Sequence, residues 1–187
     1  MSIKKITPFL IMFATLLAGC LVIAPAARAA STSGGDSKKI SRLLSDAKFE
    51  ARQLETDSIE AESYINAGLS WQSHSNKLNA IRLHINKTGE LLTKLQNCRE
   101  EGSPWQQKAI DQIEPPLKEL VVNTTAMLQY FNDHKETIHF SDTYKEYLKS
   151  NSAMARELAT LIADYVDYGI HKAEFERLGE KVLASER

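Results

Sequence analysis

Few residues of this chain have the type and spacing needed for chemistry, and the clearest are three histidines. His74, His134 and His139 are the candidate metal ligands, because histidine is a common ligand of transition metals. His139 ends a single E-x-x-H motif, whereas a carboxylate-bridged two-metal bundle needs two such motifs and two further glutamates. His134 and His139 also lack the i, i+4 spacing of a helical zinc pair. Metal binding is therefore the alternative hypothesis, behind a non-enzymatic role.

Other kinds of catalytic or cofactor site lack support in the sequence. No Ser-His-Asp or Cys-His set, glycine-rich phosphate loop or pair of inward carboxylates can be assembled with supporting spacing. The sequence holds no C-x-x-C-H motif for covalent haem. We therefore predict that the protein is not an enzyme, with no catalytic residues and no bound cofactor.

The two cysteines have different expected fates. Cys20 ends the sequence Leu-Ala-Gly-Cys, which matches a bacterial lipobox, so it is the lipidation candidate. Cys98 is then left without a disulfide partner in the processed chain. We favour burial of Cys98 as a small apolar side chain, with a disulfide between two chains as the alternative.

Residues 1–30 have the composition of a bacterial export signal. Two lysines at positions 4 and 5 precede an apolar run over residues 6–23, and an A-x-A cleavage site ends at Ala29. Cleavage near Ala29 gives a free exported protein, whereas cleavage before Cys20 gives a lipoprotein held to a membrane by its acyl chains. Both outcomes stay open. Either one predicts an exported protein, periplasmic or extracellular, or lipid-anchored to the cell envelope.

The remaining chain divides into a short linker and one domain. Residues 31–36 are rich in glycine and serine and predict a flexible linker, and residues 37–187 are long enough for one helical domain. The chain has 23 basic and 24 acidic residues, and three of the basic ones lie in residues 1–30, so the domain is mildly acidic. This balance argues against a nucleic-acid partner. Membrane contact is expected only through the signal segment or a lipid anchor at Cys20.

Four segments of the domain place apolar residues at alternating steps of three and four, the pattern of helices in bundles and coiled coils. In residues 37–67 and 70–101 the stripe positions are Ile40, Leu44, Ala47, Ala51, Leu54, Ser58, Ala61 and Ile65, then Trp71, His74, Leu78, Ile81, Ile85, Thr88, Leu92 and Leu95. In the segments that end near residue 135 and begin near residue 141 they are Ile110, Ile113, Leu117, Leu120, Thr124, Met127 and Phe131, then Tyr144, Tyr147/Leu148, Asn151, Met154/Ala155, Leu158, Leu161/Ile162 and Tyr165. We expect the polar stripe positions to fix the register of the helices.

Local signals predict where these helices begin, bend and end. Gly68 is the expected cap at the end of the first helix. Ser103-Pro104-Trp105-Gln106 predicts a capping box with proline at the first helical position, and residues 143–146 predict a second box. The Pro115-Pro116 pair predicts a kink in a single continuous third helix.

The fold that these signals predict is all-α. It is an antiparallel up-down-up-down four-helix bundle with a Pro-kinked third helix, preceded by a cleaved signal segment. No segment has the period-two alternation of a strand. An amphipathic C-terminal tail, residues 170–187, would project beyond the bundle if it is helical.

This topology brings many rings and histidines to one end of the bundle. They are Tyr64, Trp71, His74, Tyr130, Phe131, His134, His139, Phe140, Tyr144 and Tyr147. One hypothesis is a pocket or partner surface at this end, and the favoured alternative is that the rings close the end of the bundle. Across both the aromatic end and the tail, the candidate interaction residues are Trp71, Tyr144, Tyr147, Phe175, Leu178 and Val182.

The function that the sequence favours is a non-enzymatic structural or protein-interaction module of the cell envelope. Its partner is an unknown protein or a second copy of the chain. The alternative is a small-ligand or metal-binding four-helix bundle that uses the end rich in histidine and aromatic residues.

Overall fold

The computed structural model describes residues 35–185, without the side chains of Asn66, His139 and Phe140. The predicted signal segment, Cys20 and most of the linker lie outside the described residues. Four α-helices account for most of the described chain: α1 (Lys38–Ala67), α2 (Trp71–Asn97), α3 (Pro104–Asp133) and α4 (Asp142–Ser185). Two short 3₁₀ helices, η1 (Arg99–Glu101) and η2 (Lys135–Phe140), lie in the connections. No strand occurs between residues 35 and 185, so the all-α prediction is confirmed for this part of the chain.

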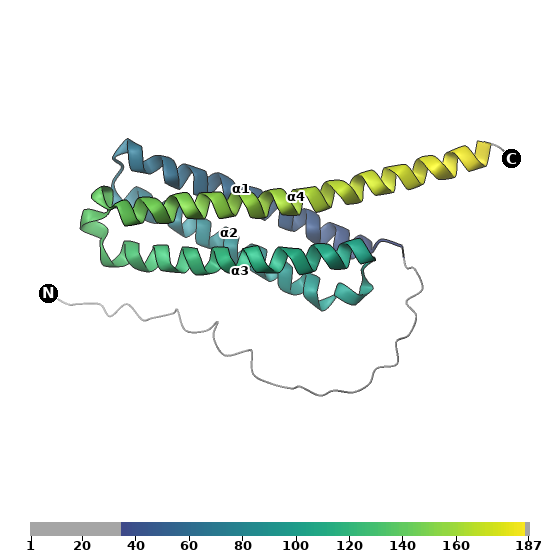
Figure 1. The fold of residues 1–187 in the computed structure, drawn as a ribbon, viewed down its shortest axis with the longest axis horizontal. Helices are drawn as coiled ribbons and strands as arrows, with labels where there is room; N and C mark the ends of the chain where they lie inside the picture. The colour runs from purple at the N-terminus through teal and green to yellow at the C-terminus, as the bar shows by residue number, and fades with distance from the viewer. Residues whose placement is uncertain (1–34, 186–187) are drawn as a thin grey trace, which may run out of the picture. The chain divides into compact units, whose positions relative to one another are not determined.

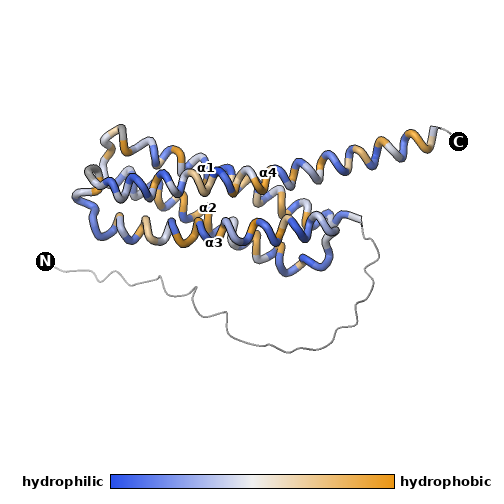
Figure 2. The backbone as a smooth tube through the Cα atoms, in the orientation of Figure 1, coloured by the Kyte–Doolittle hydropathy of each residue, from blue (hydrophilic) through white to orange (hydrophobic). Residues whose placement is uncertain are grey.

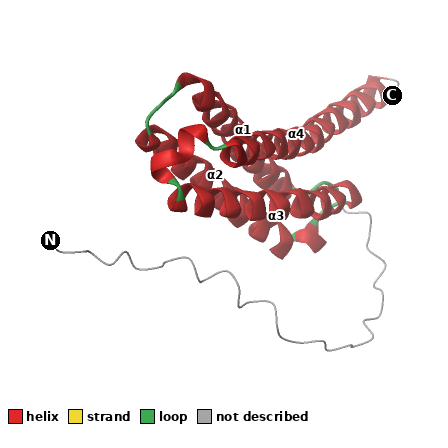
Figure 3. Cartoon of the chain, turned by 60° about the vertical axis from the view of Figure 1, so that its left-hand side comes forward, coloured by secondary structure: helices red, strands yellow, loops and turns green. Residues whose placement is uncertain are grey.

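The helices pack side by side, with α1 against α2 and α4, and α3 against α4 and α2 (Figure 1, Figure 3). Between α1 and α2, Glu50 contacts His84 and Asp57 contacts Lys77, so residue numbers rise along one helix as they fall along the other. This arrangement is consistent with the predicted four-helix bundle.

The predicted stripes form the core. Every stripe position in the first three helices is buried except Ile65 and Trp71, which are half-buried. In α4, the buried members of the stripe run from Tyr144 to Ile162. The regular spacing of apolar side chains therefore identified the buried face of all four helices.

A polar group in the core joins three of the helices. Asn151 of α4 donates a hydrogen bond to Ser58 Oγ of α1 (3.3 Å) and accepts one from Thr124 Oγ1 of α3 (2.5 Å). All three residues are at most 3% exposed. Because each polar group has a partner, this layer specifies which helices lie together at low cost in stability.

The ends of the helices follow the predicted signals with one correction. Gly68 ends α1 with φ of 61°, the left-handed conformation expected of a glycine cap. Gln106 reaches back to the backbone N–H of Ser103 (3.1 Å), as the capping box requires. The second predicted box is wrong, because Thr143 already lies inside α4 and Ser141 Oγ accepts the hydrogen bond from the N–H of Tyr144 (3.2 Å).

Helix α3 continues without interruption through Pro115 and Pro116, so the prediction of one helix across both prolines is confirmed. Helix α2 ends at Asn97, four residues before the predicted end, and η1 carries the chain on to Gly102. A side chain at position 102 would come within 2.8 Å of the Ile40 side chain, so the glycine lets this turn lie close to α1.

Helix α4 is longer than the other three and continues past them (Figure 1, Figure 3). Its last buried core residue is Val166, and nearly all of the residues from 170 onward are exposed. We call residues 170–185 the α4 extension. Among the residues from 35 to 185, no helix has the length and apolar content needed to cross a membrane.

Candidate interaction surface

The α4 extension carries the largest concentration of exposed apolar side chains in the described chain. Their exposed fractions are 51% for Ile170, 79% for Phe175, 53% for Leu178, 57% for Val182 and 64% for Leu183. Apolar turns recur along the whole extension in the hydropathy colouring of Figure 2. The predicted interaction residues Phe175, Leu178 and Val182 all belong to this set, and the structure leaves each of them accessible.

Three of these residues form one stripe. Phe175, Leu178 and Val182 are spaced by three and then four residues, so they share a face of the helix. Tyr168 lies one heptad before Phe175 and is also half exposed. We call these four residues the outer stripe. Two heptads of this spacing give the apolar seam of a short coiled coil.

The outer stripe does not continue the face that α4 buries in the bundle. Extending the buried positions of α4 at steps of three and four leads to Gly169, Ala173, Glu176 and Glu180. At about 100° per residue, Phe175, Leu178 and Val182 lie more than a quarter turn away from that line. The extension thus carries small or acidic residues on the side of the core and large exposed apolar residues on a different face.

Charged residues flank the outer stripe. Lys172 contacts Glu176 (2.5 Å) and His171 lies 3.7 Å from Glu174, both within the helix. Lys181 is also exposed, one residue before Val182. The side chains of His171 and Glu174 are 78% and 60% exposed, so they can reorient toward a partner.

The extension leaves the bundle at a cluster that sequence reasoning missed. Asp36, just before α1, accepts a hydrogen bond from Trp105 Nε1 of α3 (2.7 Å) and one from Lys172 Nζ of α4 (3.1 Å). The Trp105 ring also packs edge-on against Tyr168 (5.5 Å between centroids) and covers Gly169. We call Asp36, Trp105, Gly169 and Lys172 the clasp. It joins this part of α4 to α3 and to the residue before α1.

The clasp holds Asp36 in its charged form. Burial alone would raise the pKa of this carboxyl group, but hydrogen bonds from Ser103, Trp105 and Lys172 outweigh burial and lower the pKa below its usual value. Gly169 is essential to the geometry, because a Cβ atom there would lie 2.6 Å from the Trp105 ring.

At the opposite end of α4, the rings predicted to gather there do meet. His74 Nδ1 lies 3.1 Å from Tyr144 Oη, and the His74 ring packs edge-on against Tyr64 (5.6 Å). Phe131 packs against Tyr144 (5.8 Å). Tyr144 is only 1% exposed, and burial raises the pKa of its hydroxyl. Tyr144 is therefore a core residue, and its prediction as an interaction residue needs correction.

The other members of the aromatic end whose side chains the structure describes lie nearer the surface. Trp71 and Tyr147 are half-buried, and Lys135 Nζ lies 5.8 Å from the centre of the Trp71 ring. His134 is exposed and stacks on Tyr130 (4.1 Å). The structure thus places His74 in the core and His134 in solvent, while the side chain of His139 lies outside the described residues.

No group of three or more metal-ligating side chains that could hold an ion occurs among the side chains that the structure describes. The metal hypothesis for His74, His134 and His139 stays a prediction, which the metal content of the purified protein tests.

Cys98 is buried, as favoured from the sequence, and its thiol donates a hydrogen bond to the carbonyl of Lys94 (3.1 Å).

A second feature missed in the sequence is a charged face between α1 and α2. His84 lies between Glu50 (Nδ1 to Oε2, 2.6 Å) and Asp57 (Nε2 to Oδ2, 3.5 Å). Burial would lower the pKa of Lys77, but hydrogen bonds to Glu60 and Asp57 outweigh burial and raise the pKa.

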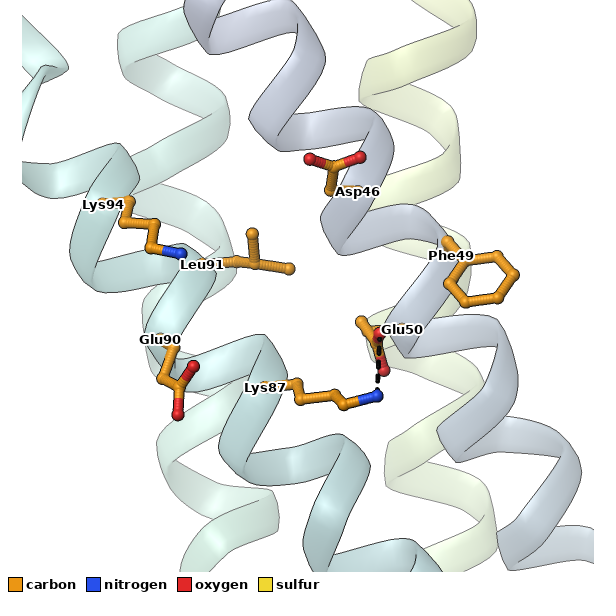
Figure 4. A pocket seen from close by; sticks show the side chains of 7 residues that line it. All are labelled: Asp46, Phe49, Glu50, Lys87, Glu90, Leu91 and Lys94. Carbon is orange, nitrogen blue, oxygen red and sulfur yellow. Dashed lines mark hydrogen bonds and ion pairs between the residues drawn. The ribbon is translucent and has the colours of Figure 1, made fainter.

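A hollow of about 320 Å³ adjoins this charged face (Figure 4). It is lined by Asp46, Phe49, Glu50, Lys87, Glu90, Leu91 and Lys94. Its lining is mostly charged, unlike the apolar lining typical of small-molecule sites.

Comparison with known proteins adds no relative to this picture. No family model matches the chain, and no curated protein or solved structure matches it at a significant level.

Proposed function

We propose that the protein is an exported, non-enzymatic interaction module of the cell envelope, and that the α4 extension is its interaction surface. The observation that carries this proposal is the outer stripe, in which Phe175 is 79% exposed and Leu178 and Val182 are more than half exposed. Apolar side chains on one face of a projecting helix lose contact with water when a partner covers them, and this stabilises the complex.

The form of the extension supports this use. It is a helix that stands on a rigid base, because the clasp joins its first turns to α3 and to the residue before α1. A helix that is already ordered loses little conformational entropy on binding. Amphipathic helices of this kind bind apolar grooves or pair with another helix.

We further propose an up-down-up-down topology with a bend in α3 at Pro115. The pairs that join α1 with α2 and α3 with α4 support this arrangement, since residue numbers run in opposite directions along each pair. A proline inside a helix removes one backbone hydrogen bond and crowds the preceding turn, which favours a bend. The bundle then acts as a support that carries the extension.

We also propose that residues 1–30 act as a signal peptide, which is removed at export. Intact-mass spectrometry of the protein from its native envelope tests this. A chain that begins near Ala30 without lipid is a free protein, and a chain that begins at Cys20 with two or three acyl groups is a lipoprotein. A chain that keeps residue 1 contradicts the proposal of export by cleavage.

The interaction surface itself is tested with Phe175→Glu and with a chain that ends after Ala173, which keeps Lys172 and therefore the clasp. Both variants are expected to fold as the unchanged protein does but to lose association, measured by cross-linking in intact cells. Arg177→Glu is the matched control, because Arg177 lies off the outer stripe on the same helix. If both variants cross-link as strongly as the unchanged protein, the extension is not the interaction surface.

A further inference from the structure

We infer that the partner of the outer stripe is a second copy of this chain, with the two α4 extensions packed antiparallel. This inference rests on the proposed function, because it identifies what covers the same surface. Three observations carry it: the spacing of the apolar residues, the charges beside them and the direction in which the stripe faces.

The spacing fits self-pairing about a two-fold axis midway between Phe175 and Leu178. In an antiparallel pair of helices this axis sets Phe175 opposite Leu178 of the second copy. It also sets His171 opposite Val182, and Tyr168 opposite Ser185. Phe175 and Leu178 thus form the centre of the seam, and the apolar residues Val182 and Tyr168 lie toward its two ends.

The charges beside the stripe are complementary in this arrangement. Glu174 and Lys181 each directly precede a stripe residue, so they lie on the same edge of the seam. With the same two-fold axis, Glu174 of one copy and Lys181 of the other are offset along the helix axis by two residues, which is about 3 Å. The symmetry creates two such opposite-charge pairs, one at each end of the seam.

A parallel pairing fits less well. In register, it would set Glu174 beside Gly179 of the second copy, where there is no side chain to pair with it. It would also set Asp167 beside Lys172, but these two side chains already pair with Lys48 and Asp36 of their own copy. Two parallel helices also align their dipoles unfavourably, whereas antiparallel helices align them favourably. The antiparallel arrangement therefore uses the charges that the chain provides.

The direction of the stripe leaves room for the second copy. The buried face of α4 points toward the other helices of its own bundle, and the outer stripe lies more than a quarter turn from that face. A second extension can therefore lie along α4 without displacing α1, α2 or α3. Its last turn would reach Tyr168, where the ring pair with Trp105 marks the edge of the clasp.

The seam is only two heptads long, so we expect a dimer with a dissociation constant on the order of micromolar rather than a permanent one. The test uses the protein as its host processes it, with the mass of its N-terminus checked, in sedimentation equilibrium. Glu174→Lys and Lys181→Glu are each expected to weaken the dimer about tenfold or more, because each replaces two attractions with two repulsions.

The decisive measurement is an equimolar mixture of these two variants. One copy then has lysine at both positions and the other glutamate at both, so the antiparallel pairs are attractive again and dimerisation returns. Arg177→Glu, off the stripe, is the control that leaves the dissociation constant unchanged. If the mixture stays monomeric, or if each single variant dimerises as the unchanged protein does, the antiparallel self-pairing is wrong.

A second measurement separates failure of this inference from failure of the proposed function. A photoreactive phenylalanine analogue at position 175 is cross-linked in intact cells. A product with twice the mass of the protein supports self-pairing. A cross-link only to another protein overturns self-pairing but retains the extension as an interaction surface, and no cross-link at all contradicts both.

Discussion

Helix α4 passes through two environments, and the contrast between them explains more than either part alone. From Tyr144 to Val166 one face of the helix is buried, and the apolar residues on that face have exposures of 0–8%. From Ile170 to Leu183 its large apolar residues are 51–79% exposed. Both parts are regular helix with apolar side chains at helical spacing. Helical spacing therefore predicts that a face is apolar, but not whether the same chain covers it.

The change of face at Gly169 shows that the extension is more than a longer version of the bundle helix. Had the buried face continued, the extension would carry apolar residues where it carries Glu176 and Glu180. Instead the large apolar residues Phe175, Leu178 and Val182 lie on another face of the helix, beyond the turn where Trp105 packs on Gly169. The two parts of α4 thus differ in environment, which is why we propose a role in folding for one and a role in binding for the other.

The largest expected difference between the two parts comes from one pair of leucines. Leu158→Ala removes a side chain that is 0% exposed, and we expect it to lower the free energy of unfolding by about 2–5 kcal/mol because of lost burial and a residual cavity. Leu178→Ala, on the same helix but 53% exposed, should change it by less than about 0.5 kcal/mol at concentrations where the protein is monomeric. Urea unfolding measures both. Equal losses would mean that the extension belongs to the folding core.

Polar residues give the next contrast. Asn151→Ala leaves Thr124 and Ser58 without their buried partner, and we expect a loss of about 1–3 kcal/mol in the free energy of unfolding. Glu176→Ala removes an exposed ion pair with Lys172 and should cost less than about 0.5 kcal/mol. Urea unfolding midpoints, compared at one protein concentration, check this pair. A small effect of Asn151→Ala would show that the polar layer is not needed for stability.

The two glycines of α4 should respond with opposite signs. Gly169→Ala places a Cβ atom 2.6 Å from the Trp105 ring, and the crowding should outweigh the helix-forming gain of alanine and destabilise the protein by about 1 kcal/mol. Gly179→Ala has no atom within 4 Å and should stabilise the helix by up to about 1 kcal/mol. Thermal unfolding should show shifts of about 2–4 °C in opposite directions. A gain in stability at both positions would mean that the Trp105 ring moves aside for the added Cβ atom at little cost.

The sequence was sufficient to predict the helices, their buried faces and most of their ends, because these depend on nearby residues. Leu78, Leu120 and Leu158 each repeat a stripe at helical spacing, and Ser103 with Gln106 forms a cap within one turn. The exposed residues Phe175, Leu178 and Val182 were also predicted, since an amphipathic tail beyond Gly169 is visible in the residues themselves.

The contacts that were not predicted join residues far apart in the chain. Asp36 meets Trp105 across 69 positions and Lys172 across 136, and no local pattern marks such pairs. Tyr144 is both a stripe position and a member of the aromatic end that was considered as a partner surface, and in the structure the rings of His74 and Phe131 cover it. The stripe therefore indicated the burial of Tyr144, whereas its position at the end of a helix did not show whether a partner could reach it.

The smallest expected effect tests whether the clasp is an electrostatic part of the base on which the extension stands. The folded-state pKa of Asp36 is lowered by its hydrogen bonds, so its contribution to stability is present above the unfolded pKa of about 3.9 and is lost as the pH falls through the folded pKa. Asp36→Asn should therefore lower the free energy of unfolding by up to about 1 kcal/mol at pH 7.

This difference between Asp36→Asn and the unchanged protein should shrink as the pH falls below about 4, because the carboxyl group takes up a proton first in the unfolded state and only at lower pH in the folded state. Asp164→Asn, at an exposed position of α4 within the bundle, is the matched substitution away from Trp105 and Lys172. Urea unfolding at a series of pH values gives both profiles. A difference that stays constant down to acidic pH would show that Asp36 holds Trp105 and Lys172 by hydrogen bonding alone, and that the bundle and the extension are joined without any contribution from its charge.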